Sequence, residues 1–329
     1  MDWQDRPVLV TGAGGFIGSH LVEALVDRGA RVRAFVRYNS RGDIGLLSLL
    51  PAPTQQTLDI VAGDLRDAHA VAEACRGITH IFHLGALIAI PYSYLHPREV
   101  VETNVLGTLN VLMAARQLGT ERLIHTSSSE VYGTARVVPI SEDHPLQAQS
   151  PYAATKIAAD KLVESFFCSY DLPVTTVRPF NAYGPRQSAR AVIPTIITQA
   201  LARDEIRLGA LTPRRDFTYV QDTVAGFIRA AEVDNAIGQT VNIGSDQEIT
   251  VGELAQKIIT LVGRSVRIVS DAQRLRAEGS EVYRLHADNR RAQELLDWSP
   301  RIPLDEGLRN TIHWISAHLD RFRPADYQV

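Results

Sequence analysis

A glycine-rich turn between an apolar run and a helix-length segment constrains this chain more than any other feature of its sequence. Val8-Leu9-Val10 runs into Thr11-Gly12-Ala13-Gly14-Gly15-Phe16-Ile17-Gly18. In such a turn Gly12 permits the tight bend, Gly15 lets a phosphate approach the backbone, and Gly18 lets the helix pack on the strand. Because the helix N-terminus then faces the phosphates, the segment predicts a dinucleotide site.

The rest of the first half alternates short β-branched runs with amphipathic, helix-length segments, which is typical of βαβ units on a parallel sheet. We expect strands at residues 8–10, 32–36, 60–61, 78–84, 122–126 and 174–177. We expect helices at residues 18–28, 68–75, 97–118 and 152–170. After residue 179 the pattern loosens into loops, with a helix at 193–202, a strand at 240–243 and a terminal amphipathic stretch.

These elements predict the α/β class, with a Rossmann-type doubly wound parallel sheet and a smaller, interleaved C-terminal substrate domain. The two halves are expected to interleave because no segment rich in Gly, Ser, Pro or charge separates them. We assign residues 1–178 and 217–243 to the dinucleotide-binding domain. Residues 179–216 and 244–329 are assigned to substrate recognition.

Composition excludes several classes of protein. The net charge of −3 and the pI near 6.4 provide no basic field, so we expect no nucleic-acid or membrane partner. The two cysteines and ten histidines form no pair or cluster of ligand spacing, so no metal is expected. The N-terminus has no basic-then-apolar signal layout, and the longest apolar stretch, residues 84–90, is too short to span a bilayer. We therefore expect a cytoplasmic protein.

The ends of the second and third strands indicate which dinucleotide binds. The second strand ends in Val36-Arg37-Tyr38-Asn39-Ser40-Arg41, without a carboxylate. A ribose 2′-hydroxyl usually meets an acidic residue here, whereas guanidinium and small polar groups suit a 2′-phosphate. The segment therefore favours NADP, with NAD as the alternative, unless the arginines are only solvated loop charges. Asp64 and Leu65, which close the third strand, are expected near the adenine edge.

Tyr152 and Lys156 are four residues apart on an expected helix, and therefore share one face. A nearby ammonium is expected to lower the tyrosine pKa toward neutrality, so that the phenolate can remove a hydroxyl proton while hydride leaves the same carbon. Ser127-Ser128-Ser129-Glu130 follows the strand at 122–126. Because active groups gather beyond the carboxyl ends of such strands, we expect these residues beside Tyr152.

These motifs, together with Asn104 in Glu-Thr-Asn-Val-Leu-Gly-Thr and Arg178-Pro-Phe-Asn181-Ala-Tyr-Gly-Pro185, resemble the extended short-chain dehydrogenases of the NAD-dependent epimerase/dehydratase family. The resemblance covers essentially the whole chain. It implies a catalytic set of Ser128, Ser129, Glu130, Tyr152 and Lys156. It implies a cofactor set of Gly12, Gly15, Phe16, Ile17, Arg37, Asn39, Ser40, Asp64, Leu65, Leu84, Ala86, Asn104, Tyr152 and Lys156. It implies substrate contacts from Ser128, Asn181, Arg190, Arg215, Tyr219, Arg276 and Glu281, although each charged one can instead be a surface charge.

Within the family, Glu130 and the segment Glu281-Val-Tyr-Arg-Leu-His-Ala-Asp288 resemble nucleotide-hexose 4,6-dehydratases, including those acting on GDP-mannose. The segments 38–40, 87–93 and 187–195 resemble the dehydratases that begin legionaminic acid biosynthesis. This resemblance implies UDP- or GDP-N-acetylglucosamine as substrate and a tightly bound dinucleotide regenerated in each cycle. One residue departs from the pattern, because many dTDP-glucose dehydratases carry Asp where this chain has Ser129.

Three alternatives share most of these residues. One is a UDP-glucuronate decarboxylase, which also tends to carry a Glu after the serines; the second is a nucleotide-sugar 4-epimerase, for which Glu130 would be unexpected; the third is a non-catalytic dinucleotide-sensing regulator. The nucleotide base, the sugar 2-substituent, the C5 configuration and the role of Ser129 stay open at this point. Two expected helices carry more apolar surface than one sheet face needs: the one with Val101, Val105, Leu109 and Leu112, and the one with residues 152–167. The family resemblance implies that they form the four-helix interface of a homodimer.

Overall fold

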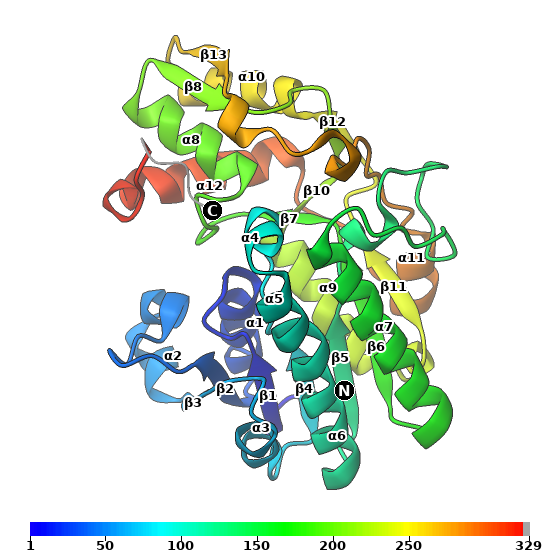
Figure 1. The fold of residues 1–329 in the computed structure, drawn as a ribbon. Helices are drawn as coiled ribbons and strands as arrows, with labels where there is room; N and C mark the ends of the chain where they lie inside the picture. Colours follow the sequence, from blue (N-terminus) through cyan, green and yellow to red (C-terminus); the bar gives the residue numbers. More distant parts are fainter. Residues whose placement is uncertain (325–329) are drawn as a thin grey trace.

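A parallel seven-stranded sheet forms the centre of the molecule (Figure 1), in a computed structural model that describes residues 1–324. Its strand order is β11-β6-β5-β4-β1-β2-β3, and every adjacent pair runs parallel. The strands are β1 (Pro7–Thr11), β2 (Arg31–Arg37), β3 (Asp59–Gly63), β4 (His80–His83), β5 (Arg122–Thr126), β6 (Val174–Pro179) and β11 (Thr240–Ile243). The expected α/β fold with a Rossmann-type sheet is confirmed.

Helices cover both faces of the sheet, because its central strands, such as β1 and β4, are buried on both sides. One face packs against α1 (Phe16–Val26), α9 (Val220–Glu232) and α11 (Arg290–Leu296), which share a core that includes Leu21, Phe227 and Leu296. The other face packs against α3 (Ala68–Cys75), α6 (Gly107–Leu118) and α7 (Pro151–Tyr170), whose core includes Val71, Leu112 and Val163.

A second, smaller body with its own apolar core lies beyond the carboxyl ends of the strands, in the upper part of Figure 1. Its helices are α8 (Val192–Ala202), α10 (Val251–Val262) and α12 (Leu304–Ala317). Three two-stranded sheets accompany them: β7 (Asn181–Tyr183) with β10 (Phe217–Tyr219), β8 (Glu205–Leu208) with β13 (Arg267–Ser270), and β9 (Arg214–Arg215) with β12 (Ile249–Thr250). The expected substrate domain runs to residue 329, and its residues 325–329 lie outside the described residues.

The helix expected at 97–118 has an irregular centre. It consists of α5 (Pro97–Val101), a π-helical turn η2 (Glu102–Leu106) and α6. The wide turn carries Asn104, whose side chain is buried, accepts a hydrogen bond from Leu87 N (2.7 Å) and donates to Leu87 O (2.9 Å). A π turn often marks a functional position, and here it lets one side chain hold the loop that follows β4.

The expected elements did not include two helices of the second half, α9 and α10. Both helices are strongly amphipathic: α9 buries Val220, Val224, Phe227 and Ile228, and α10 buries Leu254, Ile258 and Ile259. The 3.6-residue period that predicts a helix is therefore present in the sequence at both places. Helix α1 also begins earlier than expected, at Phe16 instead of residue 18. Two further short helices are α2 (Ala52–Gln56) and α4 (Ile90–Leu95). Over residues 1–324, none of the helices combines the length and apolarity needed to cross a bilayer.

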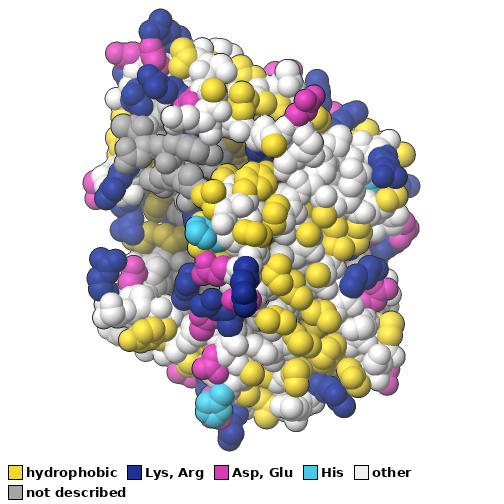
Figure 2. Space-filling model, in the orientation of Figure 1, with side chains coloured by type: hydrophobic (Ala, Val, Ile, Leu, Met, Phe, Trp, Pro, Cys, Tyr) yellow, Lys and Arg dark blue, Asp and Glu magenta, His cyan; other side chains and the backbone are white. Residues whose placement is uncertain are grey.

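An apolar strip remains exposed on the outer surface of α5, η2 and α6. Val101, Leu106, Met113 and Leu118 are each exposed although they are large and hydrophobic. Figure 2 shows hydrophobic side chains gathered over this part of the molecule. Contiguous apolar surface of this kind is typical of a face that binds another protein.

Candidate active site

The largest described cavity, about 730 Å³, lies at the carboxyl ends of the central strands. Its walls come from the glycine turn, the end of β2, the loop after β4, the segment after β5, the first turn of α7 and the segment after β6. These are the positions at which an open parallel sheet binds its ligands, because the strand order reverses beside β1. The cavity therefore brings together residues from six separate parts of the chain.

The glycine turn forms one wall and tolerates no side chains at two positions. Gly12 has a φ of +69°, and a Cβ there would lie 2.8 Å from the backbone of Gly85. A Cβ on Gly18 would overlap the carbonyl oxygen of Gly12. Helix α1 begins after Gly15 without a side-chain cap, so its first N–H groups are available to an anion. The turn, with Phe16 and Ile17 in the same wall, fits the diphosphate of a dinucleotide.

A smaller adjoining cavity of about 140 Å³ contains the residues expected at the adenine edge, Asp64 and Leu65. The Asp64 carboxylate is already bound by Arg66, with an Nη2–Oδ2 distance of 2.6 Å. This hydrogen bond lowers the pKa of Asp64. Asp64 is therefore a fixed anion in the wall of this cavity.

The end of β2 brings Arg37 and Asn39 to the main cavity. The side chain of Arg37 is 66% exposed, and its Nη2 lies 3.4 Å from Glu99 Oε1. Asn39 folds back on its own loop, since it accepts from Asp43 N (2.9 Å) and donates to Asp43 O (2.7 Å). Ser40 lines neither cavity. A carboxylate therefore does lie near the end of β2. It belongs to Glu99 on α5, so the sequence of β2 does not indicate it.

The loop after β4 supplies an apolar wall. Leu84 and Ala86 line the main cavity, as do residues 88–91. Asn104, expected at the cofactor, is not among the residues lining the two cavities. Its amide also donates to Thr155 Oγ1 at 3.0 Å. Asn104 thereby ties this loop to α7 from behind.

The serine segment after β5 turns its polar groups into the main cavity. Ser128, Ser129 and Glu130 all line it. The Ser128 hydroxyl caps the short 3₁₀ helix η3 (Ser129–Tyr132) by accepting from Glu130 N at 3.2 Å. The Glu130 side chain is only 13% exposed and lies 4.0 Å from Arg276 Nη1. A mostly buried carboxylate therefore faces the same space as two hydroxyls.

Tyr152 enters the cavity from the first turn of α7. The helix begins there because Ser150 accepts from Ala153 N (3.1 Å) and Pro151 occupies the first turn. Burial raises the pKa of Tyr152 to about 12, and a hydrogen bond with Ser128 opposes that rise. The expected lowering by Lys156 is wrong for this structure, since desolvation of the phenolate is the larger effect.

Lys156 lies behind Tyr152 and is almost completely buried. Its ammonium donates to the carbonyl oxygen of Thr126 at 2.5 Å. Burial lowers the pKa of Lys156 to about 8, although the negative charge of Asp160 raises it. Lys156 is not among the residues lining the main cavity, whereas Tyr152 is.

A second cavity of about 660 Å³ joins the first and extends into the smaller body. Asn181, Arg190 and Arg276 line both cavities, whereas Arg215 and Glu281 line only the second. Arg276 Nη1 makes no hydrogen bond and lies 4.0 Å from Glu130 Oε2 and from Glu281 Oε1. Such a guanidinium suits a diphosphate lying across the junction. Tyr219 does not reach either cavity: it is buried, with its ring 5.6 Å from that of Tyr183.

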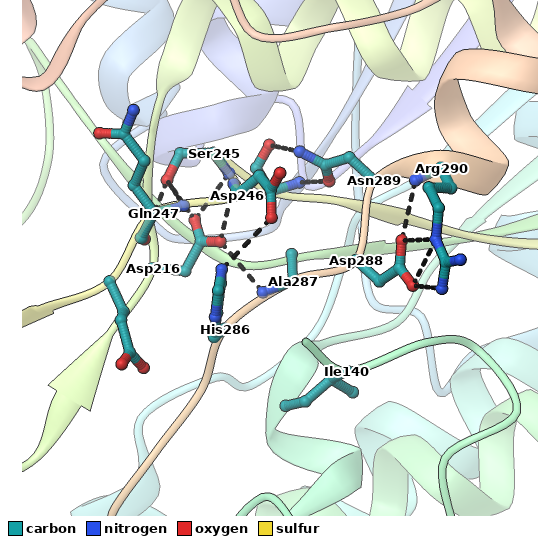
Figure 3. A network of polar contacts seen from close by, with 12 residues as sticks. Ile140, Asp216, Ser245, Asp246, Gln247, His286, Ala287, Asp288, Asn289 and Arg290 are labelled. Atoms are coloured by element: carbon teal, nitrogen blue, oxygen red, sulfur yellow. Dashed lines mark hydrogen bonds and ion pairs between the residues drawn. The ribbon is translucent and has the colours of Figure 1, made fainter. Parts of the chain in front are cut away.

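Arg215 pairs with Glu281, with an Nη2–Oε1 distance of 3.1 Å, and the next residue, Asp216, is the centre of a buried polar network (Figure 3). Asp216 Oδ1 accepts from the backbone N and the hydroxyl of Ser245, both at 2.7 Å. Its Oδ2 accepts from Asp246 N and Ala287 N, both at 3.1 Å. Burial raises the pKa of Asp216 to about 6. One buried carboxylate thus joins three separate segments beneath Arg215.

Sequence reasoning did not identify Asp160, Asp216, Gln187 or Glu99. Gln187 lines both large cavities, and its Oε1 is buried without a hydrogen bond. Asp160 follows Lys156 at the same four-residue spacing that relates Lys156 to Tyr152, and that spacing is the signal that points to it. Asp216 bonds to Ser245, Asp246 and Ala287, and Glu99 to Arg37, across at least 29 positions of sequence, so no local pattern indicates these contacts.

The sequence profile of the family described as GDP-mannose 4,6 dehydratase matches residues 9–311. The chain is 35% identical to a UDP-glucose 4-epimerase of Mycolicibacterium smegmatis, over 93% of this chain and 97% of the relative. It is 33% identical to a UDP-N-acetyl-alpha-D-glucosaminuronate decarboxylase of Bacillus cytotoxicus, over 93% of this chain and 96% of that relative. Among solved structures, a double mutant of the dTDP-glucose 4,6-dehydratase DesIV of Streptomyces venezuelae, with NAD and DAU bound, is 30% identical, with a TM-score of 0.86 over 96% of this chain and 99% of that one.

The Asp216 network predicts a specific pH dependence of stability. A carboxyl whose pKa is higher in the folded chain binds its proton more tightly there, so this group's contribution to stability falls as the pH rises from about 4 to above 6. Asp216→Asn should remove roughly 2 kcal/mol of the change in unfolding free energy between about pH 4.5 and about pH 7. It should also lower stability at both values by about 1–3 kcal/mol, because an amide N–H would face backbone donors. Urea unfolding measures both effects.

Asp246→Asn is the matched control, since Asp246 lies in the same loop and only its exposed carboxylate, 3.3 Å from His286, is altered. This variant should keep the pH dependence of the unmodified chain. An equal pH dependence in Asp216→Asn and the unmodified chain would show that Asp216 does not titrate in this range.

Proposed function

The chain belongs to the extended short-chain dehydrogenase/reductase family of NAD-dependent epimerases and dehydratases, and on this premise we propose that it is a nucleotide-hexose 4,6-dehydratase. Its relatives include epimerases, decarboxylases and dehydratases of nucleotide sugars, so the chain is an enzyme that modifies a nucleotide sugar. The observation that carries the finer proposal is Glu130, a mostly buried carboxylate in the cavity that contains Tyr152. A 4-epimerase has no need of a base at this position, whereas a dehydratase must remove the C5 proton.

The glycine turn and the adenine-side cavity support a nicotinamide dinucleotide, which would accept hydride from sugar C4 and return it to C6. Tyr152 takes the C4 hydroxyl proton, and the charge of Lys156 favours the phenolate that does so. Glu130 then removes the C5 proton, made acidic by the C4 ketone, and donates it to the C6 hydroxyl, which leaves as water. The proton removed at C4 is balanced by the one that C5 receives at the end. The product is a 4-keto-6-deoxy sugar with no net redox change.

Ser129 occupies the position at which many dTDP-glucose dehydratases carry Asp. Its side chain is buried in the cavity wall beside Glu130. A serine hydroxyl is too weak an acid to protonate a leaving group by itself. The proposal therefore gives Glu130 both roles, first as base and then as acid, with Ser129 limited to relaying a proton through water.

The proposal includes UDP- or GDP-N-acetylglucosamine as substrate, bound mainly by residues 179–216 and 244–329, and a cytoplasmic location. The diphosphate would lie at the junction of the two large cavities, near Arg276, Arg215 and Asn181. The proposal also includes a homodimer through a four-helix interface. Exposed Val101, Leu106 and Met113 on α5, η2 and α6 support this interface.

Mass spectrometry of the products tests the reaction directly. The purified protein is incubated separately with UDP-N-acetylglucosamine, GDP-N-acetylglucosamine, GDP-mannose, dTDP-glucose and UDP-glucuronate. We expect a product lighter by one water from one of the N-acetylglucosamine nucleotides. Loss of carbon dioxide from UDP-glucuronate alone would identify a decarboxylase, and an isomeric product detected by NMR would identify an epimerase. Binding of cofactor without any turnover would indicate a regulator.

Glu130→Gln separates oxidation from elimination. An amide cannot accept the C5 proton, so water loss should fall by roughly 10²–10⁴-fold. Oxidation at C4 does not use this carboxylate, so the bound nicotinamide should still become reduced when substrate is added. Stopped-flow absorbance follows the first step and mass spectrometry the second. Glu278→Gln, on an exposed residue outside the cavities, is the control, and near-normal dehydration by Glu130→Gln would refute the assignment of the base.

NADP is the proposed cofactor, and Arg37 is the residue that tests it. The Arg37–Glu99 pair is too exposed to contribute much stability, so a 2′-phosphate can replace Glu99 as the partner. Arg37→Gln should weaken NADPH binding by about tenfold or more and leave NADH binding little changed. Fluorescence titration of cofactor-depleted protein measures both constants, with Arg76→Gln, in an exposed pair with Glu73, as the control. Equal weakening of the two cofactors would contradict a 2′-phosphate contact.

A further inference from the structure

Asp160 is a buried carboxylate on the face of α7 that carries the redox residues. It lies four residues after Lys156 and eight after Tyr152, and its side chain is 5% exposed. Residues at these spacings follow one another along one side of a helix. An ionised carboxylate is rarely buried without a compensating set of partners, so its surroundings indicate what it does.

Three side chains on two strands donate hydrogen bonds to Asp160. On β6, Arg178 donates from Nη2 at 3.0 Å and from Nε at 3.2 Å. At the end of β5, Ser127 Oγ donates at 2.8 Å and His125 Nε2 lies at 3.2 Å. Burial alone would raise the pKa of Asp160, but the hydrogen bond with His125 and the charge of Arg178 lower it. Asp160 is therefore an anion at neutral pH.

The charges around Asp160 determine how it affects Lys156. Burial lowers the pKa of His125, so His125 is neutral and donates from Nε2 without adding charge. Arg178 is the direct counter-ion of Asp160. Among the described residues no ion pair joins Lys156 to Asp160, because the ammonium donates to Thr126 O instead. Asp160 therefore acts on Lys156 through space and leaves its ammonium near Tyr152.

Asp160 also fixes the segment that carries Glu130. Ser127 directly precedes the serine segment, and its backbone N donates to Val177 O at 2.8 Å. Arg178, the counter-ion, donates to the hydroxyl of Tyr132 at 2.9 Å, and Tyr132 ends η3. The same carboxylate thus holds Ser127 directly and the far end of η3 through Arg178.

We propose that Asp160 is a positioning residue that keeps Lys156 protonated at working pH and orients the end of β5 beside it. The inference rests on the proposed redox role of Tyr152 and Lys156. The negative charge of Asp160 also raises the pKa of Tyr152, so its benefit must come through Lys156. The role is the same in a dehydratase, a decarboxylase or an epimerase, because all three begin by oxidising C4.

The chain has only three lysines, Lys156, Lys161 and Lys257, which makes a direct measurement possible. The holoenzyme labelled with ¹³C and ¹⁵N in lysine is titrated by NMR, and the side-chain signals report each ammonium. Lys161 and Lys257 lie in partly exposed ion pairs with Glu164 and Asp305 and serve as internal controls. The Lys156→Arg variant assigns the remaining signal.

In Asp160→Asn the titration midpoint of the Lys156 ammonium should move to lower pH by about one unit. In Asp160→Glu this midpoint should stay near that of the unmodified chain. The two control lysines should not move. In parallel, the alkaline limit of nicotinamide reduction by UDP-N-acetylglucosamine should shift by the same amount. An unmoved Lys156 midpoint in Asp160→Asn would overturn the proposal, even if the variant were slow or unstable.

Asp160→Asn leaves Arg178 buried without its counter-ion, which can prevent folding. The double variant Asp160→Asn/Arg178→Gln removes both charges and should fold more readily, with the same downward shift of the Lys156 midpoint. The NMR readout needs no sugar nucleotide. A failure of every nucleotide to turn over would therefore count against the proposed function alone, whereas an unmoved Lys156 signal would count against the role of Asp160 alone.

Discussion

The proposed chemical centre depends on keeping one ammonium charged where water is largely excluded. Burial lowers the pKa of Lys156 to about 8, a shift that corresponds to roughly 3 kcal/mol favouring the neutral amine. Burial also opposes the phenolate of Tyr152. Two groups offset the effect of burial on the Lys156 ammonium. One is the carboxylate of Asp160, four residues along α7, and the other is the carbonyl oxygen of Thr126, 2.5 Å from Nζ. Because both redox groups are desolvated together, a change in either alters the working pH of the pair.

The topology of the sheet explains how so many partners reach this point. Strands β5 and β6 are neighbours, so Ser127, at the end of one, and Arg178, on the other, both face the middle of α7. Beyond β6 the chain leaves the sheet to build the smaller body and returns as β11. Asp216 precedes this return, and it accepts hydrogen bonds from Ser245 and Asp246, which follow β11 directly. The backbone beside Arg215 is therefore linked to the central sheet as well as to the smaller body.

Features with a local pattern could be predicted from the sequence, and features made by distant residues could not. The glycine turn, the strands of the first half and the Tyr152–Lys156 spacing are local, and the structure contains them as expected. Glu99 on α5 pairs with Arg37 on β2, and Asp216 accepts hydrogen bonds from groups that are 29 to 71 positions away in the sequence. No local sequence pattern indicates either contact. The pKa of Tyr152 was predicted in the wrong direction because the spacing indicates a nearby charge but says nothing about desolvation.

The reactions known among the relatives share the oxidation of C4, so the sheet and α7 alone do not distinguish them. What differs is the group that meets C5 and C6 of the oxidised sugar. In the proposed reaction that group is Glu130, and Arg276, which belongs to the smaller body, lies 4.0 Å from it and equally near Glu281. A diphosphate bound by Arg276 would draw this guanidinium toward the nucleotide and away from the carboxylate.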